Sequence, residues 1–111
     1  MVSPGEFRRL AMSLPEVEER AHMNHPDFRV GGKIFATLDY PERGWAIVNL
    51  IAEQQADFMG MVPEGFKSAP GTWGRSGSTL VRLSEVSRKH LSAALSAAWR
   101  KRAPARLTKG Q

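Results

Sequence analysis

Several cations and one tryptophan of this chain have the types and spacing that suit contact with a nucleic acid. They are Arg29, Lys33, Lys67, Trp73 and Arg75. Cations on one rim of a sheet can contact phosphates, and a tryptophan in a glycine-rich loop can stack on a base. Alternatively, these cations are ordinary edge charges that discourage sheet-to-sheet association, and Trp73 anchors its own loop to the core.

The formal net charge of +5 comes from one end of the chain. Residues 1–99 carry equal numbers of basic and acidic residues, whereas the last twelve residues hold cations and no acid. Those cations are Arg100, Lys101, Arg102, Arg106 and Lys109. The cluster could contact phosphates. It is also expected at the C-terminal end of a helix, because the helix dipole favours positive charge there.

His22 and His25 are the only two histidines at short spacing, and Asp27 lies nearby. Pro26 disfavours a helix here, and in an extended segment the two rings would point to opposite faces. The chain has no cysteine, so further metal ligands would have to come from Asp, Glu or His90. We therefore predict no metal site, and expect His25 to hydrogen-bond locally ahead of Pro26.

The sequence shows no residue arrangement typical of catalysis or cofactor binding. The serines do not occur in a nucleophile-elbow sequence. The spacing of Gly71, Gly74 and Gly77 could form an anion-binding nest. A strand is expected after these glycines, however, where a dinucleotide site requires a helix. We predict a non-catalytic protein without a cofactor.

Apolar periodicity predicts three helices and six strands. Helices are expected from a capping sequence at residues 3–6 to Leu14, over residues 52–61, and from Ser84 or Ser87 to about residue 103. Strands are expected at residues 17–23, 27–30, 33–39, 45–50, 66–69 and 78–83, and residues 70–77 form a loop. Gly31-Gly32 suits a hairpin turn. Strict alternation in the third strand would place Ile34, Ala36 and Leu38 on one side and Phe35 and Thr37 on the other.

The predicted order is α-β-β-β-β-α-β-β-α, which indicates an α+β fold. Helices would cover an antiparallel sheet of about five or six strands in a two-layer sandwich. We expect one domain at residues 1–104 and a loose basic C-terminal tail at residues 105–111. The lack of cysteine, of a membrane-length apolar run and of a secretory signal favours a cytoplasmic protein, and we expect a monomer.

Three stretches, read together, resemble the MmcQ/YjbR family. They are residues 7–19, residues 25–36, and residues 70–74 followed by the final helix with its Ala98-Trp99-Arg100. The run His-Pro-x-Phe-x-Val-x-Gly-Lys-x-Phe-Ala within residues 25–36 is the most specific part, and the resemblance covers roughly residues 7–107. The chain departs from the family pattern at residues 49–52, where a serine-proline helix start is more typical.

The resemblance implies a small sandwich with an antiparallel sheet, similar to frataxin-like and "double wing" arrangements. Members are commonly labelled DNA-binding proteins, and the family has no agreed catalytic residues to carry over. The domain also resembles secretion-chaperone-like folds, whose exposed sheets and helices bind protein partners.

Two functional hypotheses follow. In the first, the protein binds nucleic acid, with double-stranded DNA as the expected partner. The contacts would come from Arg29, Lys33, Lys67, Trp73 and Arg75, helped by Arg100, Lys101 and Arg102. In the second, it is a protein-interaction or small-ligand module that uses the sheet face or a pocket near His25 and Trp73. Binding to phosphates must weaken steeply with salt, whereas an apolar contact should weaken little.

Overall fold

The computed structural model describes residues 1–109, and residues 110–111 of the expected tail lie outside the described residues. Its elements are α1 (Pro4–Met12), β1 (Glu18–His22), β2 (His25–Val30), β3 (Lys33–Leu38), β4 (Trp45–Asn49), α2 (Ala52–Met61), β5 (Phe66–Ser68), α3 (Gly71–Arg75), β6 (Ser78–Arg82), the 3-10 helix η1 (Leu83–Glu85), α4 (Arg88–Arg102) and α5 (Ala105–Thr108). The strands form one sheet in the order β1-β2-β3-β4-β6-β5, and all neighbours are antiparallel. The predicted α+β class with an antiparallel sheet is confirmed.

Local sequence accounts for the helix starts. Ser3 and Glu6 form the predicted capping box of α1, and the Ser87 hydroxyl accepts from the backbone N–H of His90 at the start of α4. The start of α2 has no side-chain cap, because Ile51 stands at the N-cap position. Packing must therefore hold this end of α2, at the place where the chain departs from the family pattern.

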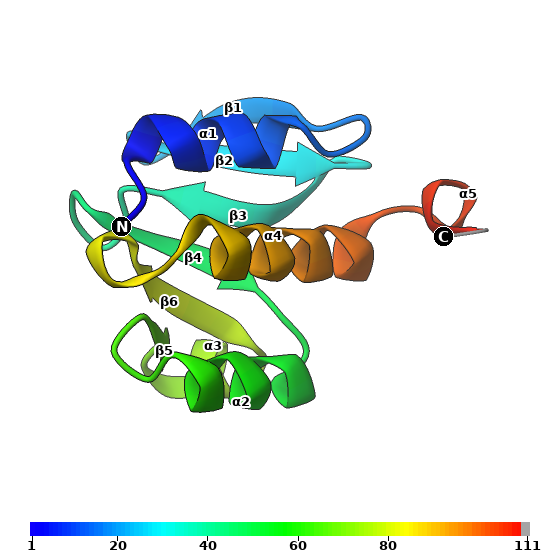
Figure 1. The fold of residues 1–111 in the computed structure, drawn as a ribbon. Coiled ribbons are helices and arrows are strands. Elements are labelled where there is room, and N and C mark those ends of the chain that lie inside the picture. Colours follow the sequence, from blue (N-terminus) through cyan, green and yellow to red (C-terminus); the bar gives the residue numbers. More distant parts are fainter. Residues whose placement is uncertain (110–111) are drawn as a thin grey trace.

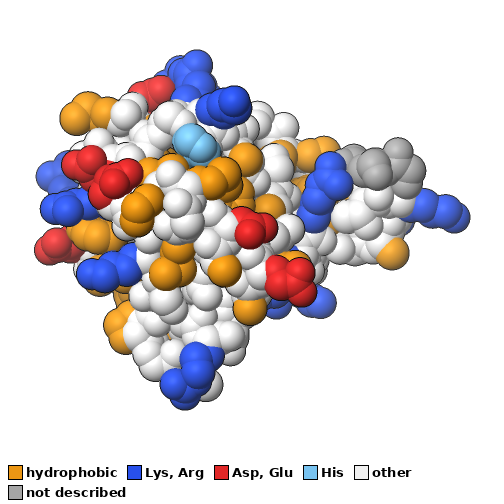
Figure 2. All heavy atoms as spheres, turned by 60° about the horizontal axis from the view of Figure 1, so that its bottom comes forward, with side chains coloured by type: hydrophobic (Ala, Val, Ile, Leu, Met, Phe, Trp, Pro, Cys, Tyr) orange, Lys and Arg blue, Asp and Glu red, His pale blue; other side chains and the backbone are white. Residues whose placement is uncertain are grey.

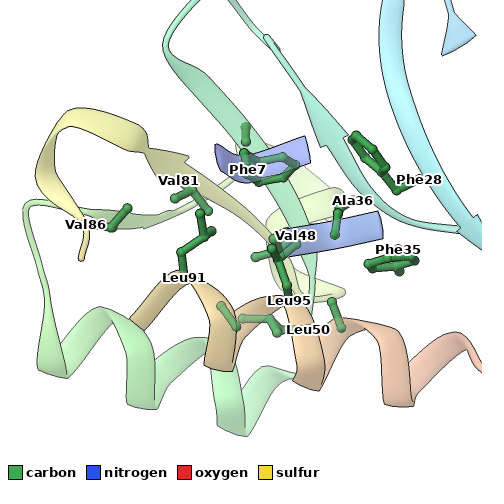
Figure 3. Packing of buried hydrophobic residues seen from close by; sticks show 14 of the residues in the cluster. Phe7, Phe28, Phe35, Ala36, Val48, Leu50, Val81, Val86, Leu91 and Leu95 are labelled. Carbon is green, nitrogen blue, oxygen red and sulfur yellow. The ribbon is translucent and has the colours of Figure 1, made fainter. Parts of the chain in front are cut away.

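The long helices α1, α2 and α4 lie on one side of the sheet (Figure 1). The core fills the space between them and the sheet. Leu91 and Leu95 of α4 point toward Val81 and Val48 of the strands (Figure 3), and all four side chains are buried. Burial of such apolar side chains is the main favourable contribution to folding.

The opposite side of the sheet, here called the open face, carries the alternate residues of each strand. In β4, Ala46 and Val48 are buried, whereas Trp45, Ile47 and Asn49 are half-buried. From the register, the open face consists of Glu18, Arg20, His22, His25, Asp27, Arg29, Ile34, Thr37, Trp45, Ile47, Asn49, Lys67, Ser78, Leu80 and Arg82. No long helix covers it in the described part of the chain (Figure 1).

The strict alternation predicted for β3 is wrong at Phe35. Phe28 pairs with Ala36 but Arg29 pairs with Ile34, so Phe35 is an extra residue opposite this step. Such a bulge changes which side of the strand the following residues face. Phe35 therefore joins the core, where it is fully buried, while Ile34 lies on the open face.

The turn-rich segment predicted as a loop contains the short helix α3. It lies across the end of β5 and β6, where the side chain of Gln55 donates to the backbone oxygens of Gly74 (3.0 Å) and Ser78 (3.1 Å). Gly77 has a φ of +106°, and a Cβ there would lie 1.6 Å from the carbonyl oxygen of Leu50. Only glycine fits this position.

The tail beyond residue 104 also differs from the expectation, because residues 105–108 form α5 rather than a loose segment. Both terminal nitrogens of Arg106 donate to the Glu16 carboxylate, at 2.9 and 2.8 Å. Leu107 packs against the core. Among the described residues, no helix combines the length and apolar character needed to span a bilayer.

We predict that Gly77→Ala lowers the free energy of unfolding by about 3 kcal/mol or more, because the methyl group collides with the Leu50 carbonyl and the backbone conformation is strained. Gly60→Ala is the matched control. A Cβ at Gly60, within α2, meets nothing within 4 Å, so this change should stabilise the helix by up to about 1 kcal/mol. Urea unfolding followed by circular dichroism measures both changes. Equal midpoints for the two variants would contradict the prediction.

Candidate functional site

A groove of about 1050 Å³ lies on the open face. Its lining includes the apolar side chains of Ile34 and Ile47. The β1-β2 turn with Met23 borders one end, and Trp73 of α3 borders another side. The volume is at the upper limit for small-molecule sites. The groove is therefore large enough for a ligand that combines apolar and polar parts.

A buried carboxylate organises the part of the groove formed by β1 and β2. The Asp27 carboxylate accepts from Nε and Nη2 of Arg29, at 2.8 and 3.1 Å, and the Asp27 side chain is fully buried. It also lies 2.7 Å from Nδ1 of His22. The hydrogen bonds from Arg29 lower the pKa of Asp27, burial opposes this shift, and the hydrogen bond from His22 adds to the lowering. Because the ionised carboxylate can only accept, Nδ1 of His22 carries the proton.

His25 is also fixed by a hydrogen bond, but its partner lies 14 positions away in the sequence rather than in the local turn that was predicted. Its Nδ1 lies 2.7 Å from the backbone oxygen of Asp39, so this nitrogen must donate. Its ring packs edge-on against Tyr40, with the ring centroids 5.1 Å apart.

The prediction that the rings of His22 and His25 point to opposite faces is wrong. The two residues are direct partners across the β1-β2 hairpin, and directly opposed residues face the same side of a sheet. Met23 and Asn24 make the tight turn possible with φ values of +48° and +68°. The described residues contain no group of three or more potential metal ligands.

Five of the predicted site residues line this one groove. They are His25, Arg29, Lys33, Trp73 and Arg102. Lys67 lies on the open face of the edge strand β5 but not in the groove lining, and neither Arg75 nor Arg100 is part of that lining. The structure thus brings His25 and Trp73 together, as the pocket hypothesis requires.

Lys101 has a different position from the one expected of a phosphate-binding residue. Its Nζ donates to Oδ1 of Asn49 at 2.7 Å and to the backbone oxygens of Leu50 at 2.8 Å and Ser76 at 3.3 Å. An ammonium group has three donors, so all are in use. Burial, and secondarily the charge of Arg102, lowers the pKa of Lys101. Lys101 therefore joins α4 to the end of β4 and to the segment after α3, and positions the groove wall.

The region that contains the groove matches a known protein family. The model of the YjbR family matches residues 12–101 of this chain. The chain belongs to the YjbR family. The matched segment contains all six strands and, apart from Arg102, every residue that lines the groove. No curated protein and no solved structure matches the chain.

In this YjbR-family chain, few acidic side chains lie on the open face. The sequence has 11 acidic residues, and the described strands place only Glu18 and Asp27 on the open face. Both form ion pairs, Glu18 with Arg20 at 3.2 Å and Asp27 with Arg29 at 2.8 Å.

Two further open-face cations have no carboxylate partner. Lys67 and Arg82 are in no ion pair among the described residues, and Arg82 instead stacks over Trp45 at 5.4 Å from the ring centroid. The open face therefore has an excess of positive charge.

Sequence reasoning missed Arg82 and the network of His22, Asp27 and Arg29. The spacing of Asp27 and Arg29 was a usable signal, because residues two apart in a strand share a face. The role of His22 could not be seen in that way, since it depends on the turn at Met23 and Asn24. Arg82 was hidden because its stacking partner, Trp45, is far away in the sequence, although β4 and β6 are neighbours in the sheet.

We predict that Asp27→Asn makes the YjbR-family fold less stable at pH 6 and that the difference from the wild type shrinks at lower pH. The pKa of Asp27 is lower when folded, so its carboxylate stabilises the fold above the ordinary pKa of about 3.9. That contribution is lost as the pH falls through the lowered folded-state pKa. Urea midpoints at pH values of about 6, 4 and 3, which lie on both sides of the ordinary Asp pKa of about 3.9, measure this change. The control is Glu53→Gln, which alters an exposed side chain that forms no ion pair in the described chain. A constant difference at all pH values would show that Asp27 acts only through packing.

Proposed function

We propose that this protein is a non-catalytic nucleic-acid-binding protein that contacts the phosphate backbone with its open sheet face. The observation that carries the proposal is the charge of that face. Its two acids are both neutralised by ion pairs, whereas Lys67 and Arg82 have no such partner in the described chain. Lys33 and Arg102 add two cations at the groove.

Seen from the side of α2 and β5, Lys and Arg side chains are spread around the molecule, with Asp and Glu among them (Figure 2). Closely mixed charges largely cancel at distances beyond about 10 Å in physiological salt. An excess of one sign on an uncovered face is better suited to attract a polyanion.

Contacts of this type position a nucleic acid without reading its sequence. Arg82 and Lys67 come from the neighbouring strands β6 and β5, so they can follow one phosphate backbone. Double-stranded DNA is the partner expected from the sequence, and phosphate contacts alone do not separate a duplex from a single strand. The proposal includes a monomeric protein in the cytoplasm.

A second candidate function is the binding of a small ligand or a peptide of a protein partner in the groove. The observation that favours it is the union of His25, Trp73 and the apolar lining in one groove of about 1050 Å³. Such a contact would bury apolar surface and depend little on salt.

We predict that labelled DNA binds in fluorescence-anisotropy titrations at about 50 mM salt and that binding weakens steeply toward about 200 mM. The double variant Lys67→Ala/Arg82→Ala should bind about tenfold more weakly, with the slope against log salt reduced by about 2. The control Arg9→Ala/Lys89→Ala removes the same charge from exposed residues of the helix side that form no described ion pair. It should keep most of the affinity.

Two results would overturn this function. Equal losses in both double variants would mean that only net charge matters. No binding by the wild type at about 50 mM salt, where several phosphate contacts should suffice, would move the search to the groove ligand or a protein partner.

A further inference from the structure

We propose that the groove holds an unpaired nucleotide, so that the nucleic acid is single-stranded where it crosses the open face. The base would stack on Trp73, its edge would meet the polar side chains at the ends of β4 and β6, and its phosphate would lie near Arg102. This inference rests on the proposed function and specifies the ligand of the same face.

Trp73 is the tryptophan that lacks a partner within the described chain. Trp99 is buried and its Nε1 donates to the Pro15 oxygen at 3.0 Å, and Trp45 lies under Arg82. Trp73 is 62% exposed and borders the groove. A large exposed aromatic ring beside a concave surface is the arrangement that single-strand binders use to stack bases.

The backbone that carries Trp73 is held in place although its ring is exposed. The backbone oxygen of Gly74 in α3 accepts from Gln55 of α2 at 3.0 Å, and the hydroxyl of Ser76, directly after α3, donates to the Thr72 oxygen at 2.9 Å. Close packing of Gly74 against Ala69 permits no larger residue. The ring is therefore presented from a fixed support, which lowers the entropy cost of binding.

Asn49 offers a defined donor to the edge of a base. Its Oδ1 accepts from Lys101, which can only donate, so Nδ2 is left with two N–H groups. Ser78 lies directly opposite Asn49 on β6 and also lines the groove. Unpaired bases are recognised through hydrogen bonds to edges that a duplex keeps engaged.

Arg102 supplies a cation for a phosphate oxygen. Its side chain lines the groove and forms no ion pair among the described residues. Its guanidinium group could therefore donate a charge-assisted hydrogen bond to a phosphate.

A duplex fits this geometry poorly. Its bases are stacked on one another and expose only their edges in the grooves, so no base face is free to stack on Trp73 or to cover Ile34 and Ile47. A single strand can place a base against these side chains, because its bases can turn away from the backbone. The combination of apolar lining, exposed ring and cation therefore favours a single strand.

The test compares a labelled oligonucleotide of about 12 nucleotides with the duplex of the same sequence, using the full chain and fluorescence anisotropy. The wild type should bind the single strand more tightly than the duplex. Trp73→Ala should weaken single-strand binding by about tenfold to a hundredfold, and Trp73→Phe by less. Duplex binding should not change in either variant. The slope against log salt should also stay unchanged, because stacking releases no counterions.

Met61→Ala is the control, since it removes an exposed apolar side chain outside the groove, and it should leave both affinities unchanged. Urea midpoints close to the wild type would show that the Trp73 variants fold. The groove inference would be overturned if the single strand and the duplex bound equally well and neither Trp73→Ala nor Trp73→Phe changed the affinity. The proposed phosphate contacts would survive that result. No binding of either nucleic acid would overturn both.

Discussion

The sheet is packed on one side only, and this determines where the charged side chains of the strands can lie. Because α1, α2 and α4 all lie on the same side (Figure 1), that side contains nearly all of the buried apolar side chains of the strands, and Leu91 and Leu95 seal it. Alternation then sends every second strand residue to a face with no helix to cover it. That face is free to hold Arg29, Lys67 and Arg82, residues that a second helix layer would have excluded.

The groove on that face depends on contacts from the other side of the molecule. Lys101, at the end of α4, crosses to Asn49, Leu50 and the residue after α3. Burying an ammonium group is unfavourable, and three acceptors offset much of that cost. Gly77 allows the close approach to Leu50 that the same region requires. The position of Trp73 thus depends on the packing of α4 and β4 as well as on the contacts of α3 itself.

Much of the fold could be predicted from the sequence because its signals are local. Neighbouring residues determine the Gly31-Gly32 turn, the capping box at Ser3 and the alternation in β4. The family resemblance indicated the overall arrangement of helices around an antiparallel sheet. The Phe35 bulge, the turn at Met23 and Asn24 and the bond from Lys101 could not be predicted in this way. The first two require backbone conformations that non-glycine residues seldom signal, and the third joins residues that are 52 positions apart.

The open face is itself divided, and this division links the groove to the phosphate contacts. Toward β1 and β2 its cations are held in ion pairs, Arg20 with Glu18 and Arg29 with Asp27. Toward β6 and β5, Arg82 and Lys67 have no acid partner in the described chain. In the proposed function, a polyanion would be attracted to the half formed by β6 and β5, whereas the acids and cations of β1 and β2 pair with one another. The groove extends from Trp73, Asn49 and Ser78 toward the paired half. A backbone held along β5 and β6 would therefore turn a base into the groove, with Arg102 at its lining.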